Sequence, residues 1–330
     1  MRRYFARKII VYIIAFIVAV TVDWGVPRIM PGNPIQEFLS KFQLQPAAAK
    51  YDYGYFFKAF GFNHPLWQQY LNYWQAIFHW NLGISMYYYP TPVTTVLSQH
   101  ILYTLALMVP AIVLAYFVGN RLGAMAARRT LLDNSVLPSS YVVSGTPYQW
   151  MALMLAFLIG GVWRILPESG AFSFSEIPSW NWTFVWSLVD HWFLPFLSLF
   201  LIQVGGWAIG MRNLIIFELE SDYAHWLQAL GSPPRLVRRY AYRNAVLPQL
   251  SGLALALGTF LAGQIVTEIV FDYPGLGTVF FTAITNSDVF LMQGAFLLVI
   301  MGVLIANFVI DIVYVLVDPR TRVSMMGGEA

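Results

Sequence analysis

The sequence contains no cysteine and little charge, and both absences restrict what the protein can do. Without cysteine in its 330 residues, the chain can form no disulfide, thiolate nucleophile or cysteine-ligated metal site. Only 11% of the residues are charged, whereas soluble domains carry about 25%. With 58% hydrophobic residues and a mean hydropathy of +0.60, this composition indicates an integral membrane protein. The net charge of +3 gives no reason to expect a nucleic-acid partner.

Lysine is scarce as well, and the signature motifs of several enzyme classes are missing. None of the lysines follows the glycines of a phosphate-binding loop; they are Lys8, Lys41, Lys50 and Lys58. The chain is therefore not expected to hydrolyse ATP with such a loop. It also lacks G-x-S-x-G and H-E-x-x-H, and its histidines are scattered, at His64, His79, His100, His191 and His225. An intramembrane enzyme is thus a weak alternative, and we expect no catalytic, cofactor-binding or metal-ligating residue.

Long apolar stretches predict an all-α integral membrane protein with six transmembrane helices. A bilayer requires roughly 20 apolar residues per helix. The stretches are 9–22 near the N-terminus, then Ile101–Asn120, Val136–Trp163, Trp192–Met211, Ala245–Thr267 and Val289–Ile310. A cleaved signal peptide is the alternative for the first stretch, but no small-x-small cleavage site follows it cleanly. Pro110 is expected to kink the second helix, and the glycine pairs at 160–161 and 205–206 to permit close helix packing.

The distribution of basic residues predicts the orientation in the membrane. Six helices place both termini on one side. Most of the 19 lysines and arginines lie on that side, in the N-terminus, the turn at 121–129, the loop at 212–243 and the tail at 320–322. By the positive-inside rule this side is cytoplasmic, and we expect a multi-pass protein of the plasma or inner membrane.

These helices and loops divide the chain into four parts. Residues 1–30 hold the first transmembrane helix with its cytoplasmic N-terminus, and 31–92 form a large extracytoplasmic, aromatic-rich loop after it. Residues 93–317 form a five-helix transmembrane core, and 318–330 form a cytoplasmic tail. The core includes a polar loop at 218–248 between the fourth and fifth helices. Asp23, alone before Arg28 in the first helix, is expected to face other helices or the outer interface rather than to bind a solute.

The aromatic-rich loop allows two interpretations. Tyrosine, phenylalanine and tryptophan recur throughout it, from Tyr51 to Tyr89. In one interpretation they form a surface that meets an extracytoplasmic partner or flanks the translocation mouth. In the other they form an aromatic belt at the membrane interface. The belt is the more economical interpretation for most individual rings. His64 and His79 are too isolated to form a metal pair.

The polar loop from Glu218 to Pro248 is the longest charge-dense segment between two apolar runs, and its pattern predicts a short amphipathic helix. Ser221 or Asp222 stands where it can cap the first turn. One apolar stripe follows at helical spacing, made of Tyr223, Trp226, Leu227 and Leu230. Gly231 is expected to end this helix, Ser232 to cap the next one, and Pro234 to lie in its first turn. A basic ramp then leads back to the membrane, at Arg235, Arg238, Arg239 and Arg243.

This loop resembles the cytoplasmic "EAA" loop of ABC-importer membrane subunits, and within them that of the dipeptide/oligopeptide permease family. The residues that carry the resemblance are Asp222-Tyr223, Ala229, Gly231, Arg243-Asn244-Ala245 and Leu247-Pro248. The chain departs from the family pattern at Leu227, Leu230 and Ser232-Pro233-Pro234, which makes the surface more apolar. The resemblance implies that this loop is a coupling helix that docks on a cytoplasmic ATPase. The implied docking residues are Asp222, Tyr223, Trp226, Leu227, Ala229, Leu230, Gly231 and Arg235.

Other motifs extend the resemblance over nearly the whole chain. They are Gly61-Phe-Asn-His-Pro-Leu-Trp67 in the aromatic loop, the turn from Glu268 to Gly277, and Asp318-Pro-Arg320 near the end. Proline and two glycines predict a tight turn with a short helix after it. Glu268 is expected to form a structural hydrogen bond to that turn rather than to contact substrate.

The resemblance also implies partners and a transport function. The expected partners are a second homologous permease subunit, two cytoplasmic ATPase subunits that bind ATP and magnesium, and an extracytoplasmic substrate-binding protein; the chain itself needs no cofactor. Together the two permeases would import dipeptides or oligopeptides, with oligosaccharides as the alternative cargo. An ion-coupled secondary transporter and a non-transporting anchor subunit remain alternatives. The sequence leaves open the cargo, the pore-lining residues, and whether the second permease is identical.

Overall fold

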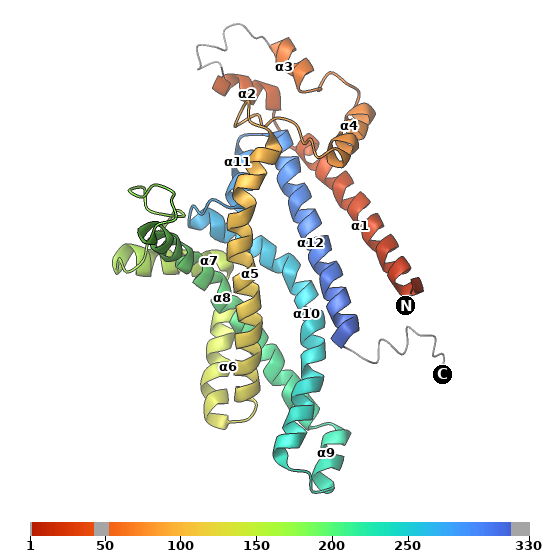
Figure 1. Ribbon diagram of the computed structural model, residues 1–330, viewed down its shortest axis with the longest axis vertical. Helices are drawn as coiled ribbons and strands as arrows, with labels where there is room; N and C mark the ends of the chain where they lie inside the picture. The colour runs from red at the N-terminus through yellow and green to blue at the C-terminus, as the bar shows by residue number, and fades with distance from the viewer. Residues whose placement is uncertain (1, 43–52, 318–330) are drawn as a thin grey trace. The chain divides into compact units, whose positions relative to one another are not determined.

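A computed structural model describes residues 2–42 and 53–317 of the chain (Figure 1). The side chains of residues 2–7, 41–42, 251, 254–260, 262 and 313–317 are not described. The tail at 318–330, with Asp318-Pro-Arg320, lies outside the described residues. Within the described ranges the chain folds into helices without a strand, which agrees with the predicted all-α class. A β-bridge joins Ile84 to Pro92.

The helices belong to two compact units. Unit 1 contains Tyr103–Pro274 and residues 306–317, and unit 2 contains Arg2–Leu102 and Gly275–Ile305. The longest helices are α1 (Arg2–Ile29), α5 (Val93–Ala126), α8 (Trp182–Leu219), α10 (Pro234–Val270) and α12 (Val289–Val317).

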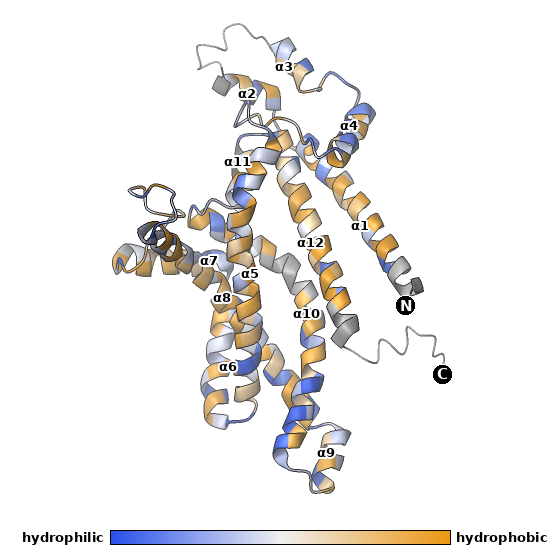
Figure 2. Cartoon of the chain, in the orientation of Figure 1, coloured by the Kyte–Doolittle hydropathy of each residue, from blue (hydrophilic) through white to orange (hydrophobic). Residues whose placement is uncertain are grey.

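Four of the described helices are long and apolar enough to cross a membrane. These candidate spans are Lys8–Ile29, Val93–Ala126, Trp182–Leu219 and Val289–Ile312. Each contains one of the apolar stretches identified in the sequence, and hydrophobic residues run along most of the length of α1, α5 and α12 (Figure 2). The chain is therefore an integral membrane protein by composition and helix length. Proline does not interrupt these helices: α5 continues through Pro110 and α8 through Pro195.

The stretch at Val136–Trp163 differs from the single helix that its hydropathy predicts. It consists of α6 (Thr130–Gly145) and α7 (Tyr148–Leu155), which continues as a π-helical segment at Ala156–Val162. The two arms meet at an angle of 101°. Thr146 is extended, with φ −77° and ψ 127°, because the residue before a proline is pushed out of the helical region. This stretch is a broken span or a re-entrant loop.

The stretch at Ala245–Thr267 lies inside α10, a continuous helix that begins in the polar loop. Pro248 does not interrupt it. Since several of its side chains are outside the described residues, six transmembrane helices stay a prediction.

The core of unit 1 is built around α8, which packs against α6, α7 and α10. Leu194 and Leu199 of α8 are fully buried with Leu107 of α5 and Phe271. A Cβ atom at Gly205 would lie 2.7 Å from the Ser140 carbonyl oxygen of α6, so glycine permits this close approach, as the sequence predicts.

The neighbouring glycines differ from Gly205. A Cβ atom at Gly206 would meet nothing within 4 Å, so that residue makes no close contact. A Cβ atom at Gly160 would lie 2.7 Å from the side chain of Glu168, in the loop that follows the π-helical segment. Close helix packing is therefore confirmed at Gly205. At Gly206 nothing in the described part of the chain comes close, and at Gly160 the near neighbour is a loop residue rather than a helix.

Much of the aromatic loop in unit 2 is a folded aromatic core. It contains α2 (Pro34–Phe42), α3 (Tyr53–Ala59) and α4 (Leu66–Phe78). Phe56 is 1% exposed, and its ring meets that of Phe38 edge to face with centroids 4.8 Å apart. Trp67, by contrast, is 66% exposed. The buried rings therefore form neither a membrane belt nor a partner surface. Composition alone could not predict their packing, because it joins residues distant in the sequence.

Two buried carboxylates hold other parts of unit 2 together. Asp288 accepts hydrogen bonds from the Ser85 hydroxyl at 2.5 Å, the Tyr87 backbone amide at 2.9 Å and the Leu291 amide at 3.0 Å. It thereby caps the start of α12 and anchors the segment before α5. Asp23 is 3% exposed and accepts a hydrogen bond from the hydroxyl of Tyr73 on α4, at 2.5 Å. Asp23 therefore faces a neighbouring helix, as predicted.

Candidate functional site

The polar loop forms the predicted short helix, α9 (Asp222–Ala229), between the end of α8 and the start of α10. It lies at one end of unit 1 and packs against both long helices (Figure 1). Ser221 occupies the N-cap position, but its hydroxyl donates to the Glu218 carbonyl at 2.6 Å and caps no helical amide. Its backbone carbonyl accepts from Ala224 at 3.0 Å instead. The predicted side-chain cap is therefore wrong, although the predicted helix start is correct.

Gly231 ends α9 as predicted. Its φ of +75° lies in the left-handed region, and a Cβ atom there would meet nothing within 4 Å, so backbone conformation rather than space calls for glycine. The Ser232 amide donates to the Leu227 carbonyl at 3.0 Å, which closes the end of the helix. Ser232 does not cap α10, because Pro233 holds that position and Pro234 begins the helix. Proline suits this position, because backbone amides in the first turn of a helix have no partner within the helix, so the N–H that proline lacks is not needed.

The apolar stripe of α9 splits into a buried and an exposed part. Ala224 is fully buried, and Tyr223 and Leu227 are partly buried. Trp226 is 70% exposed and Leu230 is 76% exposed. The contact of α9 with its own chain thus uses Ala224, which the sequence analysis missed. Its spacing of three from Leu227 was the available signal.

A carboxylate at the end of α8 ties the three helices of the loop together. One side-chain oxygen of Glu218 accepts from the Tyr223 hydroxyl at 2.7 Å and from the Asn244 amide nitrogen at 3.0 Å. Burial, and then the Glu218 carboxylate, raises the pKa of the Tyr223 hydroxyl above its ordinary value. The phenol therefore stays protonated at physiological pH and keeps donating. We call these three residues the Glu218 triad; it fixes α9 relative to α8 and α10.

Further contacts connect this end of the loop to the rest of unit 1. Met211 and Ile215 of α8 are buried with Ala124 of α5 and Ala245 of α10. Arg212, next to Met211 in the sequence, donates to both carboxylate oxygens of Asp133 on α6, at 2.9 and 2.6 Å. The bidentate geometry fixes the orientation of both side chains. These contacts connect the ends of α8 and α10 beside the loop to α5 and α6.

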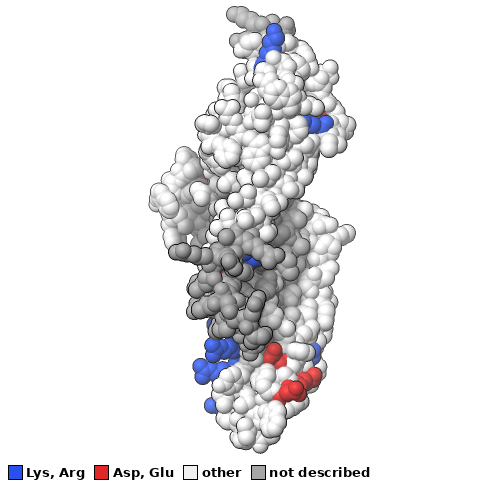
Figure 3. Space-filling view, turned by 90° about the vertical axis from the view of Figure 1, so that its right-hand side faces the viewer, with Lys and Arg blue, Asp and Glu red and all other residues white. Residues whose placement is uncertain are grey.

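Most of the predicted docking residues are accessible to a partner. Those exposed are Asp222, Trp226, Ala229, Leu230, Gly231 and Arg235. The arginines of the basic ramp are exposed too, and charged side chains of both signs gather at the end that carries α9 (Figure 3). In the described part of the chain, no three His, Cys, Asp or Glu side chains gather as metal ligands. The loop thus exposes two large apolar side chains, Trp226 and Leu230, among charged residues. We call these two residues the tip of α9.

Comparison with known proteins identifies the family. A family model described as "Binding-protein-dependent transport system inner membrane component" matches residues 111–323, well over half of the chain and including the whole α9 loop. The chain belongs to this family.

Relatives of known name align over almost their entire length. The chain is 29% identical to the dipeptide transport system permease protein DppB of Escherichia coli K12, over 98% of the chain and 99% of the relative. It is 30% identical to the di/tripeptide transport system permease protein DppB of Pseudomonas aeruginosa, with the same coverage. It is 24% identical to the oligopeptide transport system permease protein AppB of Bacillus subtilis, over 97% and 99%. The predicted resemblance and the prediction of a transport subunit rather than an enzyme are confirmed.

The turn at 268–277 also has the predicted form. α10 ends at Val270 and α11 (Leu276–Thr285) follows the turn. Glu268 is fully buried and accepts from the Thr104 hydroxyl and from the Gln264 amide, both at 2.9 Å, while its backbone carbonyl accepts from the Tyr273 amide at 2.8 Å. These contacts join the Glu268 carboxylate to α5 and α10 and its backbone carbonyl to the turn, and they favour the structural interpretation of this residue.

Proposed function

We propose that this chain is the membrane-spanning permease subunit of an ATP-driven, binding-protein-dependent ABC importer, and that α9 is its coupling helix. The observation that carries the proposal is the exposure of Trp226 and Leu230 on a short helix whose inner side is held by the Glu218 triad. Large apolar side chains in a polar, charged surface mark a protein interface. Family membership supports an importer as the setting of that interface.

The proposed mechanism treats α9 as the end of a lever. Closure of an ATPase dimer around ATP would displace α9. Because the Glu218 triad links α9 to α8 and α10, both long helices would tilt with it. The pair Arg212–Asp133 would carry the movement on to α6. Tilting these helices would switch the translocation pathway between outward and inward access.

The proposed cargo is a dipeptide or short oligopeptide. This rests on the relatives, whose names describe dipeptide, di/tripeptide and oligopeptide transport. An oligosaccharide is the alternative cargo within the same architecture. The chain would supply half of the pathway beside a second homologous permease. Two ATPase subunits would bind ATP and magnesium below it, an extracytoplasmic binding protein would deliver the cargo, and both termini would be cytoplasmic.

The docking assignment is tested by placing a charge on the tip. Trp226→Asp should abolish ATP-dependent uptake of a dipeptide in proteoliposomes and reduce the amount of ATPase that co-purifies. Leu227→Asp, at the partly buried position, should do the same and also weaken the packing of α9. Trp180→Asp is the matched control, because Trp180 is fully exposed but lies outside the α9 loop. Normal uptake and normal co-purification in Trp226→Asp would contradict the assignment, as would uptake driven by an ion gradient without any ATPase.

A further inference from the structure

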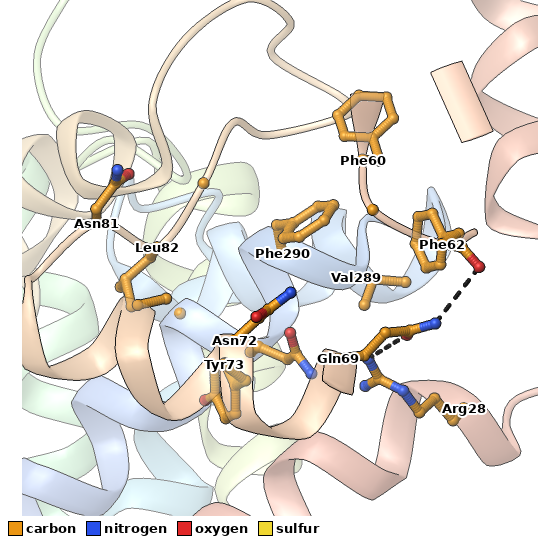
Figure 4. A pocket seen from close by; sticks show the side chains of 15 residues that line it. Arg28, Phe60, Phe62, Gln69, Asn72, Tyr73, Asn81, Leu82, Val289 and Phe290 are labelled. Atoms are coloured by element: carbon orange, nitrogen blue, oxygen red, sulfur yellow. Dashed lines mark hydrogen bonds between the residues drawn. The ribbon is translucent and has the colours of Figure 1, made fainter. Parts of the chain in front are cut away.

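Unit 2 contains a cavity that the transport proposal does not use. Its volume is about 200 Å³ (Figure 4). The walls come from segments distant in sequence: the end of α1 at Arg28, the turn at 60–62, α4, the segment at 81–83 and the start of α12. A cavity of about 150 Å³ can hold benzene, and drug-sized sites begin at about 300 Å³. The volume here lies between the two and suits a small organic molecule.

One wall carries a fixed positive charge. Arg28 donates to the Trp24 carbonyl at 2.6 Å and to the side-chain oxygen of Gln69 at 3.0 Å, and its guanidinium lies 3.9 Å from the centre of the Trp24 ring. Gln69 is held in turn by its amide nitrogen, which donates to the His64 carbonyl at 2.7 Å. The stick view shows Arg28 and Gln69 pointing toward each other beside the cavity (Figure 4).

This charge has no counter-ion within the described residues. No carboxylate of those residues is paired with Arg28, and Arg28 is the only charged residue that lines the cavity. Asp23 lies on the same helix, but its hydrogen bond goes to the Tyr73 hydroxyl and none joins it to Arg28. A cation held by neutral neighbours in a partly enclosed space favours an anion as its ligand.

The other walls combine aromatic rings with carboxamides. Phe60, Phe62 and Phe290 supply the apolar side. Asn72 and Gln293 supply polar groups, and Gln293 is only 4% exposed with no hydrogen-bond partner for its amide nitrogen. Rotation of this carboxamide about its last bond exchanges its nitrogen and oxygen, so it can offer a donor or an acceptor to the cavity.

The local backbone keeps this space open. Gly61 and Gly83 line the cavity with φ of +72° and +85°, and a Cβ atom at Gly83 would lie 3.2 Å from the Phe290 ring. A side chain at Gly83 would therefore be strained and would press on an aromatic wall. Glycine at these two positions suits the backbone conformation that this wall of the cavity requires.

We propose that this cavity binds a small monocarboxylate with an apolar body, of the size of one amino-acid residue. The carboxylate would accept from Arg28, a neighbouring amide of the ligand would pair with Gln293 or Asn72, and the apolar body would lie against Phe60, Phe62 and Phe290. The single charge of Arg28 balances that of a monocarboxylate, whereas a phosphate dianion would keep one charge unpaired. This binding is independent of the ATPase docking at α9, which belongs to unit 1.

The test compares two ligands that differ only in charge. The full chain, purified with its partner subunits in nanodiscs of neutral lipid, is titrated calorimetrically with N-acetyl-L-leucine and with N-acetyl-L-leucinamide, without nucleotide. The carboxylate should bind at least tenfold more tightly than the amide. Inorganic phosphate should not compete at equal concentration. Equal affinities for acid and amide, effective competition by phosphate, or no binding to folded protein would overturn the proposal.

Two variants assign the binding to the cavity. Arg28→Gln should weaken binding of the carboxylate at least tenfold and leave that of the amide unchanged. Ala76→Leu, which fills the cavity without touching the charge, should weaken both ligands. Lys58→Gln is the matched control, because Lys58 is an exposed cation of the same unit outside the cavity. If Arg28→Gln fails to fold, Ala76→Leu decides: unchanged carboxylate affinity in that variant places the ligand elsewhere and overturns the assignment.

Discussion

Two regions of this chain are rich in large apolar side chains but use them in opposite ways. In the aromatic loop of unit 2, Phe56 is 1% exposed and packs against other rings of its own chain. At the tip of α9 in unit 1, Trp226 is 70% exposed. The first region buries part of its rings in a core of its own, whereas the exposed ring of the second has no partner in the described chain.

Exposure has a different meaning in the two environments of a membrane protein. Leu102 on α5 is 69% exposed, but it belongs to a candidate span that lipid can cover. α9 is a short helix followed by a basic ramp, and its polar surroundings exclude burial in hydrocarbon. An exposed large apolar side chain is therefore informative in the α9 loop and uninformative on α5, because only in the loop does it call for a protein partner.

Truncating the aromatic core should have the largest effect on stability. Phe56→Ala should destabilise the fold by about 3–5 kcal/mol, because it removes a fully buried ring and leaves a cavity. Thermal unfolding in detergent, together with proteolysis of the 31–92 region, measures this loss. Trp67→Ala, at a 66% exposed site, should stay within about 0.5 kcal/mol of the parent protein. Equal losses in both variants would contradict the distinction between a buried core and an exposed surface.

Truncating the tip of α9 should affect docking and leave stability unchanged. Leu230→Ala should weaken ATPase binding by about 1.5 kcal/mol, roughly tenfold, because Leu230 would become buried only in the complex. Binding of the purified ATPase to the permease in nanodiscs measures the change. The matched control is Leu71→Ala on α4, also an exposed leucine, which should bind normally. A lowered melting temperature without weaker binding in Leu230→Ala would assign this residue to the fold instead.

Loosening the Glu218 triad should reduce the coupling between ATP hydrolysis and transport, with a smaller change in free energy than the two truncations above. Tyr223→Phe removes one donor to Glu218 and should weaken the hold on α9 by about 1 kcal/mol. Transport per ATP hydrolysed should fall, while ATPase binding should stay close to normal. Tyr240→Phe is the control, an exposed tyrosine on α10. Unchanged coupling in Tyr223→Phe would show that the triad is dispensable.

The same triad predicts how coupling depends on pH. Since burial, followed by Glu218, raises the pKa of Tyr223, its neutral form is favoured in the folded protein. The stability that the neutral Tyr223 hydroxyl contributes is fully present below the ordinary tyrosine pKa, near 10. It is lost only as the pH rises through the still higher pKa of the folded state. The triad should therefore add no pH dependence to coupling between about pH 6 and pH 9. A change in that range that disappears in Tyr223→Phe would contradict this expectation.

The smallest effect is expected from the basic ramp. Arg235 is exposed, so its attraction to an acidic group on a partner is screened by solvent. Arg235→Gln should weaken docking by about 0.5 kcal/mol, and less at high salt. A loss as large as that of Leu230→Ala would mean that this arginine is buried in the complex.

The sequence predicts local features of the fold better than contacts between distant residues. Helix periodicity and Gly231 predicted α9 and its end, and hydropathy predicted four of the long helices. The break at Thr146 was missed because hydropathy averages over proline and glycine. The Glu218 triad was missed because Glu218 and Asn244 are 26 residues apart. For the same reason, composition showed that the segment at 31–92 is rich in aromatic residues but did not predict the core inside it.

Single-cysteine cross-linking tests the central claim most directly, because the chain contains no cysteine of its own. Trp226→Cys and Trp180→Cys, each in the assembled importer with its ATPase, would be treated with a short thiol-to-amine cross-linker. The account predicts that the cysteine at position 226 becomes joined to the ATPase and that ATP changes the yield, while the cysteine at position 180 is not joined. Cross-linking to the ATPase from position 180 and none from position 226 would contradict the account.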